Sequence, residues 1–275
     1  MEQYEKRGYL RDDYRIFHLT DRARRSFAFH YHDFYKVLVL LQGRVNYCVE
    51  GRSFSLEPND VVLISEGELH HPEVLDDSPY ERIILYLSPE FLRRYQEEAD
   101  LLRCFREARE HGSNVLRLPE GERSRLLQAV QELVRVSEGF GGALYRRAKL
   151  LEFLILLNRA VTDRDTRYIP QQPQSDGRIM PVLQYINQNL SQPMTVESLS
   201  QQFYISRYHL MHLFRSETGY TLLGYITEKR LHLSRQLLRQ GRSVTQACYE
   251  AGFTNYSSFL RAFKKRYGAL PRQAE

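Results

Sequence analysis

Short apolar runs separated by turn-forming residues dominate residues 25–88. The stretch GRVNYCVEGRSFSLEPNDVVLIS contains runs rich in Val, Tyr, Phe and Ile. These runs are separated by Glu-Gly at 50–51 and by Pro-Asn-Asp at 58–60. Such runs are typical of β-strands, and these residues suit the turns between them. YERIILYLS at 80–88 predicts another strand. Short strands at this spacing predict a small sandwich or barrel.

After residue 88 the apolar spacing becomes helical. Ser88 is placed to cap a helix whose first residue is Pro89. Further along, ALYRRAKLLEFLILLNRAV at 143–161 is apolar on most of its circumference, so we expect a helix that is buried on several sides. Either its own domain or a second subunit could supply that cover. A homodimer is therefore one expectation.

A polar stretch with two prolines and a terminal glycine, TDRDTRYIPQQPQSDG, follows at 162–177. Its composition is typical of a linker. We therefore expect an N-terminal domain over 1–162, a linker over 163–177 and a C-terminal domain over 178–275. The predicted fold is two-domain α+β, with a β barrel followed by helices and then an all-α module.

The predicted C-terminal domain contains two near-copies of one motif. LSQQFYISRYHLMHLFRSETG at 199–219 aligns with ACYEAGFTNYSSFLRAFKKRYG at 247–268. Each copy has the pattern of a short helix, a tight turn and a second helix, which is a helix-turn-helix. Gly252 supplies the permissive backbone of the second turn. Tyr204 stands at that place in the first copy, which predicts a less regular turn.

The second helix of each copy has an apolar stripe opposite a polar one. Leu210 and Phe214, like Phe259 and Phe263, lie on the stripe expected in the core. The opposite stripes suit a major groove, because Arg can bind a guanine edge and Met or Leu can contact a thymine methyl. Ordinary solvated helix faces are the alternative. The candidate DNA-binding residues are Arg207, Tyr208, Met211, His212, Arg215, Tyr256, Ser257, Leu260, Arg261, Lys264 and Lys265, with Arg266 as a further phosphate contact.

A single helix over 221–241 is predicted to join the two copies. About 20 residues of helix span roughly 30 Å. One turn of B-DNA is about 34 Å. This spacer would therefore let both second helices enter successive major grooves on one face of the duplex.

Charge separates the two predicted domains. Residues 178–275 carry 13 basic and 5 acidic groups, a net of +8, and residues 1–177 carry 26 and 29, a net of −3. A basic domain suggests a polyanionic partner. No apolar run approaches the roughly 18 residues that cross a bilayer. Three widely spaced cysteines argue against a disulfide framework, so we expect a cytoplasmic protein with no membrane partner.

The run from TVESLSQQFYISRYHLMHLFRSETG through YITEKRLHLSRQLL to VTQACYEAGFTNYSSFLRAFKKRYGALP resembles the AraC/XylS family of bacterial transcription regulators. The resemblance covers about 95 residues and implies double-stranded DNA as a partner. Leu270 departs from the family's usual Ser or Thr before the last proline. The most specific matches are Ala251, Gly252, Phe253, Phe259, Phe263, Lys264, Gly268 and Pro271, together with Arg230 in the joining helix.

The same family often carries an N-terminal cupin domain that senses an effector, and residues 30–70 resemble both cupin motifs. His30 and His32 match the paired histidines, and His70 matches the end of the second motif. Lys36 stands where the resemblance implies a carboxylate ligand. An ammonium has no lone pair and repels a cation, which argues against a metal. We expect no cofactor.

Three alternatives stay open for this site: a pocket for a small polar effector, barrel side chains with no ligand, and a metal held by the histidines alone. A sugar or another small metabolite fits the first alternative. The candidate effector-binding residues are His30, His32, Lys36, Tyr47 and His70.

The leading hypothesis is thus a non-enzymatic, sequence-specific DNA-binding regulator controlled by an effector. The family leans towards activation, and an activator would also contact RNA polymerase. The first competing hypothesis is a metal-dependent cupin enzyme fused to a DNA-targeting module. The second is a constitutive DNA-binding protein with a purely structural barrel.

Overall fold

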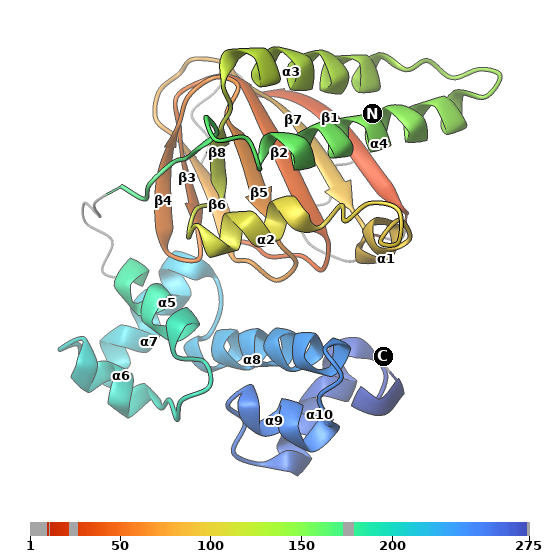
Figure 1. The fold of residues 1–275 in the computed structure, drawn as a ribbon. Coiled ribbons are helices and arrows are strands. Elements are labelled where there is room, and N and C mark those ends of the chain that lie inside the picture. Colours follow the sequence, from red (N-terminus) through yellow and green to blue (C-terminus); the bar gives the residue numbers. More distant parts are fainter. Residues whose placement is uncertain (1–9, 11, 22–26, 173–178, 274–275) are drawn as a thin grey trace. The chain divides into compact units, whose positions relative to one another are not determined.

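The computed structural model describes Leu10 and residues 12–21, 27–172 and 179–273. The chain forms two compact units, Met1–Pro173 and Gln174–Glu275. The first contains the strands and four helices, and the second is all-helical (Figure 1). The predicted order, a β-rich domain with following helices and then an all-α module, is confirmed.

Two antiparallel sheets build the first unit. The larger has the strand order β1-β7-β2-β5-β8-β9 and the smaller has the order β4-β3-β6. The predicted barrel is therefore not closed by a continuous ladder, and the two sheets instead face each other across a shared apolar core. The strands are β1 (Tyr14–Asp21), β2 (Tyr35–Gln42), β3 (Val45–Val49), β4 (Arg52–Leu56), β5 (Val61–Ile64), β6 (His70–Val74), β7 (Tyr80–Leu87), β8 (Val115–Arg117) and β9 (Arg167–Tyr168).

The two turns predicted from the sequence lie between consecutive strands. Glu50 and Gly51 join β3 to β4 and have φ angles of 51° and 80°. Positive φ at both central residues suits the twist of a two-residue hairpin. Asn59, with φ 76°, lies in the turn between β4 and β5. Asparagine tolerates this left-handed conformation better than most residues.

Both faces of the larger sheet are buried at its strands β2, β5 and β7, which explains why these strands are nearly continuous apolar runs. Along β2, Val37 and Val39 pack in a cluster with the helices of the first unit. Leu38 and Leu40 belong to the other cluster, which includes Tyr47 of the smaller sheet. Because side chains alternate along a strand, Lys36 lies on the same face as Leu38. The lysine is therefore placed at the inter-sheet core.

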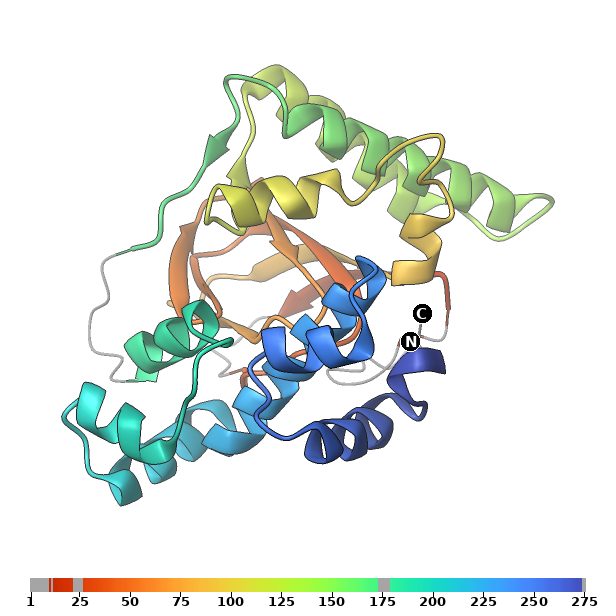
Figure 2. The ribbon, with the colours of Figure 1, turned by 60° about the horizontal axis from the view of Figure 1, so that its bottom comes forward.

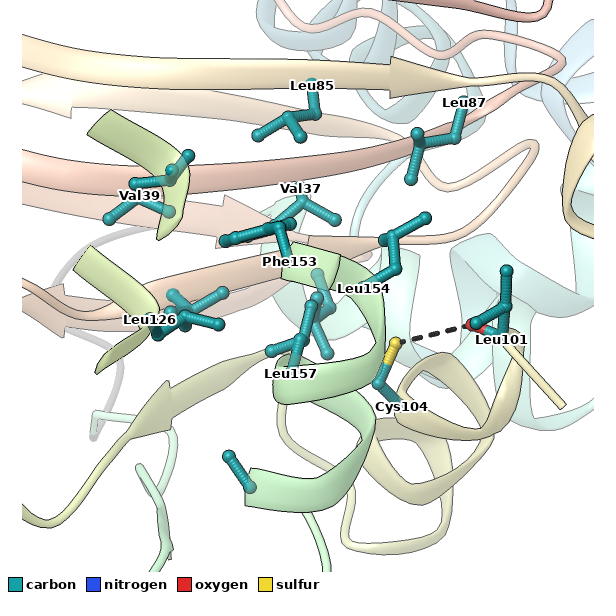
Figure 3. Packing of buried hydrophobic residues seen from close by; sticks show 14 of the residues in the cluster. Val37, Val39, Leu85, Leu87, Leu101, Cys104, Leu126, Phe153, Leu154 and Leu157 are labelled. Atoms are coloured by element: carbon teal, nitrogen blue, oxygen red, sulfur yellow. Dashed lines mark hydrogen bonds between the residues drawn. The ribbon is translucent and has the colours of Figure 1, made fainter. Parts of the chain in front are cut away.

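Helices cover the outer face of the larger sheet, with α3 and α4 side by side (Figures 1 and 2). Phe153, Leu154 and Leu157 of α4 point towards β2 and β7 (Figure 3). The expected N-cap is confirmed, because the Ser88 hydroxyl accepts a 3.0 Å hydrogen bond from the amide of Phe91. The helices are α1 (Pro89–Arg93), α2 (Arg103–Glu110), α3 (Glu120–Arg135) and α4 (Gly142–Ala160).

Several strands lie outside the range predicted from the sequence. β1 pairs with β7 along its whole length, from Tyr14 opposite Leu87 to Asp21 opposite Tyr80. β9 pairs with β8 and lies within the stretch 163–177 that has the composition of a linker. Two- and three-residue strands carry too little periodicity to be recognised, because their pairing is set by the tertiary structure.

The second unit is organised around the long helix α8, which lies between α5–α7 and α9–α10 (Figures 1 and 2). α6 with α7, and α9 with α10, form the two predicted helix-turn-helix motifs. Asn255 caps α10 by accepting a 2.8 Å bond from the Ser258 amide. The helices are α5 (Ile179–Gln188), α6 (Val196–Gln202), α7 (Arg207–Thr218), α8 (Leu222–Arg239), α9 (Val244–Glu250) and α10 (Tyr256–Tyr267), followed by the 3-10 turn η1 (Pro271–Gln273).

The turns of the two motifs share one backbone feature. Gly252 has φ 92°, and Tyr204, at the matching place, has φ 53°. A left-handed conformation is costly for a residue with a Cβ atom, so the first turn is the more strained of the two. Tyr204 nevertheless adopts the same left-handed conformation as Gly252, so the backbone does not show the less regular turn that the sequence predicts.

Candidate functional site

The helix α7 buries one stripe and exposes the other. Leu210 and Phe214 are fully buried, and the Phe214 ring lies 5.5 Å from that of Tyr225 on α8. On the opposite side Tyr208 and Met211 have exposed fractions of 77% and 44%. The other predicted DNA-binding residues of this helix, Arg207, His212 and Arg215, are exposed as well.

The helix α10 has the same arrangement. Phe259 and Phe263 are fully buried in a cluster with Leu231 and Leu238 of α8. The candidate residues include Arg261 in the middle of the helix, whose guanidinium donates a 3.3 Å hydrogen bond to the Ser258 hydroxyl. Ser257, Arg261, Lys264 and Lys265 are exposed, and Tyr256 and Leu260 are half-buried.

Arg266 does not have the expected role of a free phosphate contact. Its guanidinium bonds the Glu228 carboxylate of α8 at 2.6 Å, and the two side chains are only 13% and 26% exposed. Arg266 therefore helps to attach α10 to α8. Arg207, by contrast, makes only an exposed pair with Glu197 at 3.1 Å, and such pairs are worth little in water. Its guanidinium can exchange that carboxylate for a phosphate.

The candidate ligand site in the first unit is built from two segments that meet at an isolated β-bridge between His30 and His70. His30 and His32 precede β2 and do not lie on a regular strand. The His70 ring lies 4.3 Å from the His30 ring and 4.9 Å from the His32 ring, measured between centroids. The structure therefore brings all three histidines together.

Lys36 reaches into this cluster. It is 2% exposed, and its ammonium donates to the Tyr47 hydroxyl at 2.9 Å and lies 3.3 Å from Nε2 of His70. Among the residues that the structure describes, no carboxylate contacts this ammonium. Burial, reinforced by the charge of Arg82, lowers the pKa of Lys36 to about 7. The five candidate effector-binding residues thus form one cluster.

Hydrogen bonds orient the histidine rings. Nδ1 of His32 lies 2.7 Å from the Phe34 carbonyl, and Nδ1 of His70 lies 2.8 Å from the Glu68 carbonyl. In the neutral rings these Nδ1 atoms carry the proton, which leaves Nε2 as an acceptor. Nε2 of His32 is buried and has no hydrogen-bond partner among the residues that the structure describes. Burial, together with the neighbouring charges of Lys36 and His30, lowers the pKa of both rings well below 6.5.

The donor set does not fit a metal ion. Among residues 10, 12–21, 27–172 and 179–273, no group of three or more His, Cys, Asp or Glu side chains is arranged to hold one. The ammonium of Lys36 lies beside Nε2 of His70, where a bound cation would meet both a positive charge and an engaged lone pair. The cluster instead offers one ammonium donor and imidazole acceptors, which suit a ligand that carries hydroxyl groups.

Arg82 is a residue of this region that the sequence reasoning missed. It is 4% exposed on β7 and bonds the Asp21 carboxylate of β1 at 2.6 Å. Its guanidinium also lies 4.1 Å from the centroid of the Tyr80 ring. A single arginine within the apolar run YERIILYL was the available signal, because such a charge needs a buried partner.

A second exposed feature lies on α4. Leu144 and Ile155 are 71% and 39% exposed, and Ala148 and Leu151 lie between them at spacings of four and three residues. These four residues follow one side of the helix, opposite the stripe packed on the sheet. We call them the α4 outer stripe.

Two further observations concern the cysteines and the length of the helices. Cys48, Cys104 and Cys248 are buried, and none of them forms a disulfide. None of the helices in the described part of the chain has the length and hydropathy needed to span a membrane.

Comparison with known proteins identifies both units. A family model described as an AraC-like ligand binding domain matches residues 15–154, just over half of the 275 residues. A second model, described as a helix-turn-helix domain, matches residues 199–275. The two matches correspond to the β-rich unit and to the unit with the paired motifs.

Similar proteins are named as regulators. The HTH-type transcriptional activator RhaS of Escherichia fergusonii is 24% identical over 249 residues, covering 90% of this chain and 87% of RhaS. The uncharacterized HTH-type transcriptional regulator YbfI of Bacillus subtilis is 22% identical over 236 residues, covering 85% and 81%. The structure of unsaturated fatty acid-bound ToxT from Vibrio cholerae aligns with 15% identity over 96% of each chain and a TM-score of 0.39. The chain belongs to the AraC family of transcription regulators, with an AraC-like ligand binding domain followed by a helix-turn-helix domain.

Proposed function

We propose that this regulator binds a specific DNA site through the exposed faces of α7 and α10, and that a small polar effector bound at the Lys36 cluster controls this binding. The exposed polar stripes on two matched helices, within residues 178–275 whose 13 basic and 5 acidic residues give a net charge of +8, carry the DNA part of the proposal. Such faces suit successive major grooves about one helical turn apart.

Replacing Arg261 with alanine is the sharpest test of the DNA contacts. A guanidinium on the exposed face of α10 can bind a guanine edge with two hydrogen bonds, so its loss should cost about 1–3 kcal/mol of binding free energy. Specificity should relax at one base position. The measurement is selection of bound sequences from a random duplex library, followed by titration of the selected site.

Arg239→Ala is the matched control, because it removes one positive charge from α8 outside the two recognition helices. It should weaken binding to all sequences alike. If Arg261→Ala also weakens all sequences alike, Arg261 contacts phosphate and not a base.

The effector part of the proposal is supported by the buried acceptor Nε2 of His32, which no described residue bonds, and by the buried ammonium of Lys36. Polar groups in a protein interior are normally satisfied, so a partner that supplies hydroxyl groups would complete the site. A sugar or a small hydroxylated metabolite has that chemistry. Ligand binding would shift the populations of conformations that bind DNA well and poorly.

We further propose that the protein acts as a homodimer and as an activator that contacts RNA polymerase. The α4 outer stripe supports the dimer, since apolar side chains at helical spacing are suited to pack against a second copy of the same helix. The name of RhaS as an activator supports the direction of regulation.

Introducing glutamate at both Leu144 and Ile155 should convert the dimer to a monomer. Charges placed on an apolar interface lose hydration without gaining partners. Sedimentation at micromolar concentration measures the change, and Leu223→Glu, at a 54% exposed leucine of α8, is the control. A wild-type protein that sediments as a monomer under these conditions would rule out the dimer.

A further inference from the structure

The segment between α5 and α6 holds the two helix-turn-helix motifs together. It leads directly into the N-cap of α6, Thr195, and so belongs to the first motif. One of its residues is also bonded to the second motif. The hydroxyl of Ser191 donates a 2.7 Å hydrogen bond to the carbonyl of Glu250, the last residue of α9. The joining helix α8 is thus not the only connection between the motifs.

Arg230, halfway along α8, binds the same segment. Its Nε donates to the carbonyl of Leu190 at 3.0 Å and its Nη2 to the carbonyl of Gln192 at 2.7 Å. The guanidinium is half-buried, and desolvation lowers its pKa from the usual value. Its position just beyond the C-terminus of α5 is favourable for a cation. A planar fork with several donors can bond two carbonyls at once, which an ammonium does less well.

Gly252, in the turn of the second motif, closes against this assembly. A Cβ atom placed on it would lie 2.1 Å from the Leu190 carbonyl oxygen and 2.8 Å from Nε of Arg230. The first of these neighbours is backbone and cannot move aside by itself. Only glycine therefore lets the turn of the second motif approach the segment that begins the first.

From this geometry we infer that Arg230 and Gly252 are positioning residues that set the spacing between the two recognition helices, α7 and α10. The inference rests on the proposed function, since spacing matters only if both helices bind one DNA site. We call the contacts of the segment 189–195 with Arg230, Glu250 and Gly252 the brace. Without the brace, α8 still joins the motifs, but the segment 189–195 is released from α8 and α9. The protein would then tolerate DNA half-sites at more than one separation.

The test uses DNA sites selected from a random duplex library by the full-length wild-type protein. Each selected site is resynthesised with one or two base pairs inserted between its halves. Each inserted pair rotates the second half by about a tenth of a turn. We expect the wild type to lose at least tenfold in affinity on insertion. Arg230→Met should lose less than threefold on insertion, although it binds the original site more weakly.

Arg230→Lys should restore part of the spacing preference, because an ammonium can still bond one carbonyl. Arg239→Met, which removes a positive charge from the same helix, should keep the full insertion penalty. A merely destabilised protein would bind all the sites more weakly and would keep the wild-type ratio between them. Equal insertion penalties for wild type and Arg230→Met would overturn the inference.

A pair of glycine variants tests the brace without altering a charge. Gly252→Ala and Gly241→Ala both place a Cβ on a residue with positive φ, 92° and 82°, but nothing lies within 4 Å of the Cβ at 241. Only Gly252→Ala should reduce the insertion penalty and speed amide hydrogen exchange over 189–195. If both variants behave alike, the close approach at Gly252 does not set the spacing.

Failure of the proposed function would look different. In that case the wild type would enrich no sequence from the library, and the hydrogen-exchange comparison would still decide whether the brace exists. Faster exchange over 189–195 in Arg230→Met than in Arg239→Met supports the brace, and equal exchange contradicts it.

Discussion

Replacing Lys36 with methionine is expected to make the stability of the N-terminal unit much less dependent on pH. The unfolded lysine has a pKa near 10.5, whereas burial lowers the pKa in the folded protein to about 7. Between these values the unfolded chain binds a proton that the folded chain does not. The free energy of unfolding therefore rises with pH from about 7 to 10.5, by roughly 1.4 kcal/mol per pH unit at most.

Below pH 7 Lys36 is protonated in the folded protein as well, and its buried charge then lowers the free energy of unfolding by the full amount. Lys36→Met should remove it, at the cost of the hydrogen bonds to Tyr47 and His70, about 1–3 kcal/mol. The difference in unfolding free energy between variant and wild type should therefore favour the variant more at pH 6 than at pH 9. Urea denaturation at both pH values measures this difference.

Lys149→Met is the matched control. Two carboxylates, Glu132 and Glu152, raise the pKa of Lys149, so this lysine stays protonated in both states across the same pH window. The free energy of unfolding of Lys149→Met should therefore change with pH in parallel with that of the wild type. A parallel curve for Lys36→Met as well would show that the ammonium of Lys36 is not destabilised by burial.

Lys36→Met also tests whether the effector binds at this site. A ligand present at 100 times its dissociation constant adds about 2.7 kcal/mol to the free energy of unfolding. A compound that raises the melting temperature of the wild type through this site should lose that effect in Lys36→Met. Stabilisation that survives the substitution would place the effector elsewhere.

Replacing Phe263 with alanine is expected to abolish specific DNA binding. The ring is fully buried between Phe259 and Tyr267, with centroids 5.6 and 4.6 Å away. Removing it should cost about 3–5 kcal/mol, a large part of the 5–15 kcal/mol that holds a typical domain together. The face of α10 would then lose its fixed position. Thermal unfolding and titration of a selected DNA site measure the two effects.

Tyr208→Ala provides the contrast, because this tyrosine is 77% exposed on α7. It should change stability by less than about 0.5 kcal/mol but still weaken binding to the selected DNA. Equal loss of stability in both variants would contradict the assignment of core and exposed stripes.

Local patterns were sufficient where the relevant interactions are close in sequence. The cap at Ser88 and the turn at Gly252 followed from residue type, because each acts on backbone groups within a few residues. The apolar stripes of α7 and α10 followed from the 3.6-residue period. The clustering of His30 and His70 came from the resemblance to the family and not from periodicity.

What the sequence did not reveal depends on contacts between distant segments. β1 is recognised only through its pairing with β7, and Arg82 is explained only by Asp21 on that neighbouring strand. Arg266 has the composition of a DNA contact, yet Glu228 binds it from another helix. The two sheets do not close into the barrel that the sequence predicts, and this too depends on strand pairing that no local pattern encodes.

The central claim is that α7 and α10 together bind one specific DNA site. The most direct measurement is selection by the full-length protein from a random duplex library at about 0.1 M salt, with footprinting of the enriched sequence. We expect two protected half-sites centred about 10–11 base pairs apart on one face of the duplex, both required for full affinity. Enrichment of no sequence above non-specific binding would contradict it, as would a single half-site bound with full affinity.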